Sequence, residues 1–248
     1  MSDLAQNIFE IENRSPSGNK SRKRRERNVV KNERLRARHP LQLEPKTEKQ
    51  SDYLGALRTQ DQVFATGGAG TGKTYIPSRF SITELLAGNC EQIIISRPTV
   101  CRPEHKLGFL PGSAKQKMEP WLIPIIAAMK EQVNKIKVDE WLKTDVIEFV
   151  PFEHMRGRTF KNAFVILDEA QNCTLQDLRL FLTRIGEDTK VVVTGDTDQI
   201  DIPNSGLATV IKMIEDHEIS ASVIKFGPQD VVRSKIAREW VTAFSKSA

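Results

Sequence analysis

The sequence contains little cysteine and no long apolar run. Only 3 of its 248 residues are Cys, and their odd number and wide spacing exclude a disulfide framework and a zinc site. No apolar stretch approaches the length of a membrane span, and the polar residues 1–14 do not resemble a secretory signal. These absences predict a cytoplasmic protein that does not associate with a membrane.

Positive charge is concentrated in one segment near the N-terminus. Residues 19–40 hold ten Lys or Arg and two Glu, a net charge of +8, so the rest must carry −3 to give the chain total of +5. We expect residues 1–45 to be a disordered basic arm and residues 46–248 to be one folded domain. Three interpretations of the arm stay open: a grip on nucleic-acid phosphates, a solubilising tail and a targeting signal.

Segments typical of strands and helices alternate after residue 45. Strands are predicted over residues 63–66, 92–96, 146–150, 163–167, 191–193 and 223–226. Helices are predicted over residues 48–57, 74–86, 113–137 with breaks near Pro120 and Pro124, 174–185, 206–217 and 229–244. This alternation, with short connections, predicts an α/β fold in which a mostly parallel sheet has helices on both faces.

The most informative motif is a glycine-rich loop between a predicted strand and a predicted helix. Its residues are Gly67, Gly68, Ala69, Gly70, Thr71, Gly72, Lys73 and Thr74. Glycines let the backbone wrap an anion and direct several N–H groups inward, and the following helix adds its N-terminal dipole. We predict that Lys73 reaches the β- and γ-phosphates of a nucleotide and that the Thr74 hydroxyl holds Mg²⁺.

Two further predicted strands end in polar residues. Asp168 and Glu169 follow the most hydrophobic strand, and open α/β sheets bind ligands at the carboxyl ends of their strands. We predict that Asp168 holds Mg²⁺ and that Glu169 orients or deprotonates the attacking water. Gln199 follows the strand over residues 191–193. Its amide can donate and accept, which suits a sensor of the γ-phosphate, and the alternative is an ordinary β-turn.

The ordered set of motifs over residues 46–244 resembles the PhoH family of P-loop ATPases, which is related to the core of the superfamily 1 helicases. The motifs that carry the resemblance are Gly-Ala-Gly-Thr-Gly-Lys-Thr (68–74), Ser-Arg-Pro (96–98), Leu-Gly-Phe-Leu-Pro-Gly (107–112), Met-Arg-Gly-Arg-Thr (155–159), Leu-Asp-Glu-Ala-Gln-Asn (167–172), Thr-Gly-Asp (194–196), Gln-Ile-Asp (199–201) and Asp-Val-Val-Arg (230–233). The resemblance implies a P-loop NTPase with a single RecA-like sheet that uses ATP and Mg²⁺. It also implies a homo-oligomeric ring, expected to be a hexamer.

The resemblance also implies roles for three further residues. Gln50 matches a glutamine that reads adenine, Gln199 one that lies near the γ-phosphate, and Arg233 an arginine that neutralises transition-state charge. Because the chain has room for one such domain, we expect Arg233 to reach the nucleotide of a neighbouring subunit. From its spacing alone, Arg233 is explained equally well as a solvated charge on an amphipathic helix.

Contact with single-stranded RNA or DNA is predicted for a basic stretch around Arg97, Arg102 and Lys106. These side chains suit phosphates, while Phe109 offers a stacking face. A subunit interface or the ATP site is the alternative for this stretch, and the role of Arg156 and Arg158 stays undecided.

The sequence therefore predicts a cytoplasmic, Mg²⁺-dependent ATPase that is coupled to single-stranded RNA or DNA, as a helicase or translocase. The alternative is a nucleic-acid-binding regulatory protein in which ATP mainly controls assembly. A small-molecule kinase ranks last because no phosphoacceptor-binding motif is visible. A nuclease domain is not expected, since the region before residue 46 is short and lacks clustered carboxylates.

Overall fold

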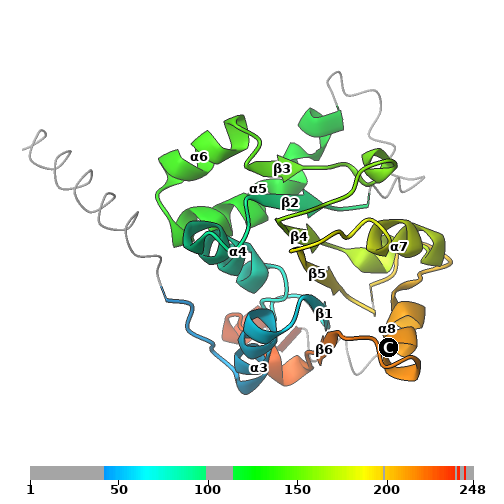
Figure 1. The fold of residues 1–248 in the computed structure, drawn as a ribbon. Coiled ribbons are helices and arrows are strands. Elements are labelled where there is room, and N and C mark those ends of the chain that lie inside the picture. The colour runs from blue at the N-terminus through cyan, green and yellow to red at the C-terminus, as the bar shows by residue number, and fades with distance from the viewer. Residues whose placement is uncertain (1–41, 99–113, 198, 238, 241–242, 244–248) are drawn as a thin grey trace, which may run out of the picture. The chain divides into compact units, whose positions relative to one another are not determined.

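Six parallel strands form the central sheet of the computed structural model (Figure 1). The structure describes residues 42–98, 114–197, 199–237, 239–240 and 243. The strands are β1 (Gln62–Thr66), β2 (Gln92–Ser96), β3 (Ile147–Phe149), β4 (Ala163–Leu167), β5 (Lys190–Gly195) and β6 (Ser222–Lys225). Their order is β3-β2-β4-β5-β1-β6 and every pairing is parallel, which confirms the predicted α/β class.

Helices cover both faces of this sheet. One face carries α3 (Glu48–Thr59), α4 (Tyr75–Ala87), α5 (Ala114–Gln132) and α6 (Lys135–Lys143), and the other carries α7 (Leu175–Leu182) and α8 (Leu207–Asp216) (Figure 1). Short 3-10 turns lie at η2 (Phe152–Met155), η3 (Ala170–Asn172) and η4 (Pro228–Asp230). These elements belong to one compact unit, which spans Pro40–Ala248.

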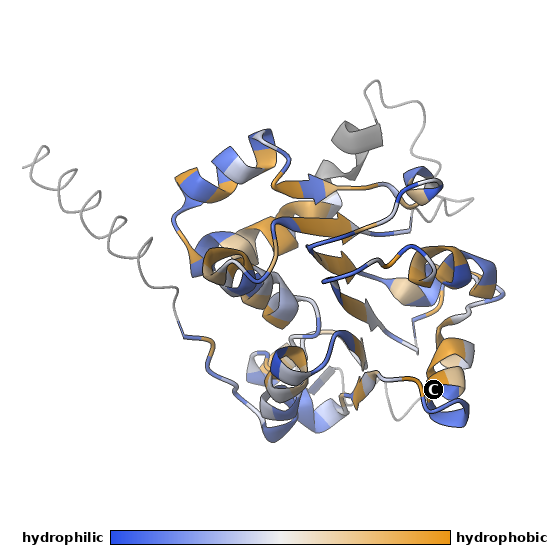
Figure 2. Ribbon diagram, in the orientation of Figure 1, coloured by the Kyte–Doolittle hydropathy of each residue, from blue (hydrophilic) through white to orange (hydrophobic). Residues whose placement is uncertain are grey.

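Alternate residues of the strands β1, β2, β4 and β5 contribute to the two apolar cores. In β4, Phe164 and Ile166 pack with the α3–α6 layer, while Val165 and Leu167 pack with α7 and α8. A strand buried on both faces needs apolar side chains at consecutive positions. The strands β1, β2, β4 and β5 are accordingly mostly hydrophobic (Figure 2), and the observed bounds of all six strands agree with the predicted ones to within two residues.

The predicted breaks in the helix over residues 113–137 were wrong. Helix α5 runs through Pro120 and Pro124, and the chain breaks only after Gln132, where Asn134 caps α6 by accepting a hydrogen bond from Ile136 N at 2.9 Å. A proline removes one helical hydrogen bond and usually kinks the helix. Here the apolar face of α5 is buried in the core, and this packing offsets that loss.

The predicted closing helix over residues 229–244 was also wrong at its start. The chain first makes the turn η4, in which Asp230 accepts a hydrogen bond from Gly227 N at 2.8 Å. Val231 and Val232 are then non-helical, and Val232 N donates to Gly70 O at 2.9 Å. Helical conformation begins only at residue 235, because this hydrogen bond holds the preceding segment against the glycine-rich loop.

Candidate nucleotide-binding site

The glycine-rich loop follows β1 at the carboxyl edge of the sheet. Gly67, Gly70 and Gly72 have positive φ angles of 135°, 85° and 91°. A Cβ atom on Gly67 would lie 2.5 Å from Phe226 O, and one on Gly70 would lie 2.7 Å from the Arg233 side chain. Both the turn and its close neighbours therefore require glycine at these positions.

Helix α3 supports the loop through two side chains. The buried Gln50 amide donates from Nε2 to Thr71 O and accepts at Oε1 from Lys46 N, both at 2.8 Å. The Tyr53 hydroxyl donates to Lys73 O at 3.0 Å. Burial, together with the nearby charge of Asp168, raises the pKa of this phenol well above its ordinary value. Tyr53 therefore keeps the proton that it donates to the loop. For Gln50, these contacts show support of the loop, and its recognition of adenine stays a prediction.

Thr74 and Asp168 meet at the mouth of the loop. Thr74 Oγ1 donates to Asp168 Oδ1 at 2.8 Å, and the buried Thr194 hydroxyl donates to the same oxygen at 2.6 Å. Lys73 Nζ donates to Gly68 O at 3.1 Å, so its ammonium group lies within the loop. A hydroxyl beside a carboxylate is the oxygen donor set that Mg²⁺ takes next to bound phosphates, so Thr74 and Asp168 fit this ion.

Glu169 adopts a left-handed backbone conformation, with φ 55° and ψ 40°. Such a conformation costs about 1–2 kcal/mol for a residue with a side chain, and strained residues of this kind cluster at functional sites. The Glu169 carboxylate accepts from Gln171 Nε2 at 2.6 Å, and Gln171 Oε1 accepts from Asp196 N at 3.0 Å. Gln171 is buried, so it forms a shielded bridge between the predicted water-activating carboxylate and the end of β5.

Arg97 lies beside the acidic pair. Its guanidinium nitrogens are 3.7 Å from Asp168 Oδ2 and 3.8 Å from Glu169 Oε1. The guanidinium carbon lies 5.6 Å from the centre of the Trp121 ring, within range of a cation–π contact. Of the interpretations left open for Arg97, the geometry favours the one that places it at the nucleotide site.

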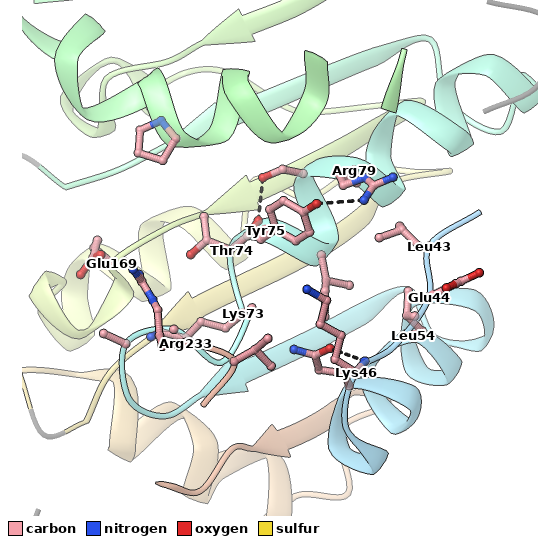
Figure 3. A pocket seen from close by; sticks show the side chains of 18 residues that line it. Leu43, Glu44, Lys46, Leu54, Lys73, Thr74, Tyr75, Arg79, Glu169 and Arg233 are labelled. Carbon is pink, nitrogen blue, oxygen red and sulfur yellow. Dashed lines mark hydrogen bonds between the residues drawn. The ribbon is translucent and has the colours of Figure 1, made fainter. Parts of the chain in front are cut away.

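Arg233 lies on the glycine-rich loop of its own chain. Its side chain covers Gly70 and lines the same cavity as Lys73 and Glu169, and in Figure 3 it points toward Glu169. It stands in the non-helical segment after η4 rather than on the predicted helix. This placement favours a role within one chain, and the reach toward a neighbouring subunit stays a prediction.

The loop, Glu169 and the C-terminal segment border a cavity of about 590 Å³ (Figure 3). This volume lies in the range of pockets that hold cofactors and small molecules. The sequence-predicted residues that line it are Gln50, Ala69, Gly70, Gly72, Lys73, Thr74, Glu169 and Arg233. Residues that were predicted from four separate segments of the sequence therefore meet at one cavity in the structure.

Other predicted residues are not part of this cavity. Gln199 is exposed, its backbone N–H donates to Asp196 O at 3.3 Å, and it is not among the described lining residues. Its sensing role stays a prediction. Arg158 pairs with Glu148 through hydrogen bonds of 2.8 and 2.6 Å, which indicates a structural role. Arg102, Lys106, Phe109 and the basic arm over residues 19–40 lie outside the described residues.

Sequence reasoning missed three buried side chains that support the site. Gln171 follows Glu169 by two positions inside a motif that had been singled out, so its amide was a visible signal. Thr194 directly follows a predicted strand, where a hydroxyl is a weaker signal. Tyr53 lies on a predicted helix, and no local pattern indicates that it reaches Lys73.

A glycine-rich loop that opens onto a helix, a lysine within that loop, and a hydroxyl–carboxylate pair at the carboxyl edge of a parallel sheet define a P-loop nucleotide-binding protein. The PhoH-like protein family matches residues 42–245. The chain therefore belongs to the PhoH-like family.

Bacterial relatives support this membership. A PhoH-like protein of Synechocystis sp. is 40% identical over 205 residues, which are 82% of this chain and 62% of the relative. Protein PhoH of Escherichia coli K12 is 38% identical over 205 residues, which are 81% of this chain and 57% of the relative. The chain thus spans about three fifths of the length of the curated relatives that it matches.

Two solved structures align with this chain, both with a TM-score below 0.5. The large terminase of a thermophilic bacteriophage aligns with a TM-score of 0.48 at 13% identity, over 80% of this chain and 50% of that chain. The Pif1 helicase of Candida albicans aligns with a TM-score of 0.36 at 15% identity, over 76% of this chain and 42% of that chain.

In the part of the chain that the structure describes, no helix is long and apolar enough to cross a membrane.

Proposed function

We propose that this protein is an ATPase that hydrolyses ATP with Mg²⁺ and couples hydrolysis to single-stranded RNA or DNA. The observation that carries this proposal is the contact of 2.8 Å between Thr74 Oγ1 and Asp168 Oδ1, with Glu169 at the same cavity. The resemblance to the PhoH family also supports assembly into a ring, which we propose to be a hexamer. Two free, buried cysteines among the described residues suit the reduced cytoplasm.

In this mechanism the N–H groups of the loop and the Lys73 ammonium bind the β- and γ-phosphates. Thr74 and Asp168 would hold Mg²⁺, which neutralises phosphate charge when bound. Glu169 accepts the proton of the attacking water, while Gln171 and Arg97 keep its carboxylate in place. Arg233, which lines the same cavity, supplies positive charge beside the loop.

Two substitutions test the hydrolytic site. Lys73→Ala should abolish ATP turnover, because it removes the cation that binds the phosphates. Glu169→Gln should still bind ATP but hydrolyse it at least about a hundredfold more slowly, because the amide cannot accept the proton. The matched control is Glu91→Gln, an exposed carboxylate immediately before β2. Turnover by Lys73→Ala at the wild-type rate would show that the assignment is wrong.

A regulatory protein in which ATP mainly controls assembly is the alternative, and the basic arm is compatible with both functions. Coupled hydrolysis requires the ATPase rate to rise when a single strand is added. The rate should be measured with and without single-stranded RNA and DNA, on material of known mass in solution. A rate that stays flat while the mass changes with ATP would favour the regulatory protein.

A further inference from the structure

A second cavity, of about 540 Å³, lies on the outer side of α7 and shares no lining residue with the nucleotide site. Three of its lining residues are arginines, Arg156, Arg179 and Arg184, and one is acidic, Asp177. We call this cavity the arginine pocket. We propose that the arginine pocket binds the phosphates of a single nucleic-acid strand. This inference rests on the proposed coupling to nucleic acid.

The arginines of this pocket have no ionic partner among the residues that the structure describes. Among the described residues, no carboxylate pairs with the guanidinium of Arg156, Arg179 or Arg184, and Arg184 Nε is buried without an acceptor. Arg158, in contrast, is held by Glu148. Guanidinium groups that lack an internal partner are available to an anionic ligand, and their planar forks match phosphate oxygens.

The acidic residue of the pocket is already committed. Asp177 Oδ2 accepts from Thr174 N at 3.0 Å and from Thr174 Oγ1 at 2.7 Å, and Thr174 Oγ1 in turn accepts from Asp177 N at 3.2 Å. These hydrogen bonds form a capping box at the N-terminus of α7. There the negative charge of Asp177 also interacts favourably with the positive end of the helix dipole. The three arginines and Asp177 together therefore carry a net charge of +2 in the cavity.

The two walls of the pocket are fixed to each other. Phe160 N donates to Arg184 O at 2.9 Å, and Gly186 N donates to Phe160 O at 2.7 Å. These hydrogen bonds join the segment after η2, which carries Arg156, to the end of α7. They also explain why α7 stops at Leu182 instead of continuing to the predicted residue 185. A fixed cavity binds its ligand without first having to be ordered.

The size and remaining lining of the pocket suit a nucleotide unit. Its volume of about 540 Å³ lies in the range of pockets that hold small molecules. Leu180 gives an apolar surface, and Gln176 and Thr183 add neutral polar groups. Arginines with neutral neighbours hold a backbone without reading one sequence.

The pocket is connected to the catalytic carboxylate through its own helix. Helix α7 begins three residues after η3, whose Gln171 contacts Glu169 at 2.6 Å. Cys173 O, between η3 and α7, accepts a hydrogen bond from Gly206 N at 2.8 Å at the start of α8. A nucleic-acid strand bound at α7 can therefore shift the position of Glu169. This connection gives a physical means by which nucleic-acid binding changes the rate of ATP hydrolysis.

The test compares the full-length double variant Arg156→Ser/Arg179→Ser with the charge-matched double variant Arg58→Ser/Lys212→Ser. All four side chains are exposed, so both variants should fold, and thermal unfolding checks this. Affinity for a labelled single-stranded oligouridylate and an oligothymidylate is measured over a range of KCl concentrations. The basal ATPase rate without nucleic acid is measured in parallel.

The pocket variant should bind both oligonucleotides about tenfold more weakly than wild type. The slope of log affinity against log KCl concentration should be less steep than in wild type by about 1.4, which is about 0.7 for each lost phosphate contact. Its basal ATPase rate should stay unchanged while stimulation by the strand falls. Arg156→Lys/Arg179→Lys should be intermediate, because lysine keeps the charge but loses the planar fork.

Three results would overturn the inference while leaving the proposed function intact. In the first, wild type binds strands and the pocket variant matches its control. In the second, only binding of free AMP or pyrophosphate is lost, which would make the pocket a mononucleotide site. In the third, only the mass in solution changes, which would make it a subunit interface. If wild type binds no strand at all, the nucleic-acid part of the proposed function fails as well.

Discussion

At the scale of single residues, two neighbouring glycines of the phosphate loop should respond differently to a methyl group. Gly70 has a φ of 85°, and a Cβ atom there would meet the Arg233 side chain at 2.7 Å. Gly68 has no positive φ, and a Cβ atom there would meet nothing within 4 Å. Gly70→Ala should lower the free energy of unfolding by about 1–2 kcal/mol, and Gly68→Ala should leave it nearly unchanged. Urea denaturation without nucleotide measures both, and equal losses would contradict the described loop geometry.

Cys90 provides a pH-dependent prediction at the same scale. Burial raises the pKa of its thiol from 9.0 to about 11, and the charge of Glu84 adds to this effect. Only the thiolate reacts with iodoacetamide, so at pH 8 the folded chain should be labelled at Cys90 roughly a hundredfold more slowly than the unfolded chain. The rate should keep rising about tenfold for each pH unit up to pH 10. Peptide mass spectrometry follows it, and a rate that levels off near pH 9 would disagree with the raised pKa.

At the scale of elements, α3 supports the phosphate loop from a position 21 residues earlier in the chain, through the hydrogen bond from Gln50 Nε2 to Thr71 O. Gln50→Ala removes this bond and leaves a buried carbonyl without its donor. The free energy of unfolding should fall by about 1–3 kcal/mol, and the Kd for ATP should rise because the loop is less ordered. Gln62→Ala is the control, since it loses only a hydrogen bond of 3.5 Å to Ser220 O. Equal effects of the two changes would argue against support of the loop by α3.

The elements that the sequence predicted well are those whose signals are local. Strand β4 is a run of five apolar residues, and the phosphate loop carries its glycines, lysine and threonine within eight positions. The two clear errors depend on contacts between distant segments. Helix α5 continues through its prolines because its apolar face is buried on the sheet, and the segment after η4 is held by the hydrogen bond from Val232 N to Gly70 O. Local propensity contains no information about either contact.

The site was predicted to the same extent and for the same reason. Thr74, Asp168 and Glu169 each follow a recognisable strand, and the carboxyl ends of parallel strands meet at one edge of the sheet. The bridge of Gln171 between Glu169 and Asp196 depends instead on side-chain directions that only the folded chain fixes. The distinction between Arg158, which is paired, and Arg156, which lines the arginine pocket, likewise required the structure.

At the scale of the whole molecule, the net positive charge is concentrated in the basic arm over residues 19–40. Residues 19–40 carry +8 and the rest of the chain −3, so the arm should supply most of the salt-sensitive affinity for nucleic acid, while the arginine pocket adds the contribution of a fixed site. The body can be tested without the arm, because Pro40–Ala248 forms its own compact unit. A chain that begins at residue 42 should show a salt dependence of log affinity that is less steep than that of the full chain by about 3 or more, which corresponds to the loss of at least four phosphate contacts.

A full-length chain in which the ten Lys and Arg residues of this arm are replaced by Gln is the matched control, because it keeps the length and loses only the charge. It should behave like the shortened chain, since counterion release depends on charge and not on the presence of the segment. The residual salt dependence of both proteins should then fall further when Arg156 and Arg179 are replaced. If the salt dependence instead survives removal of the arm unchanged, the arm does not grip nucleic acid. The strand must then be held by the folded body, and the solubilising and targeting interpretations of the arm remain.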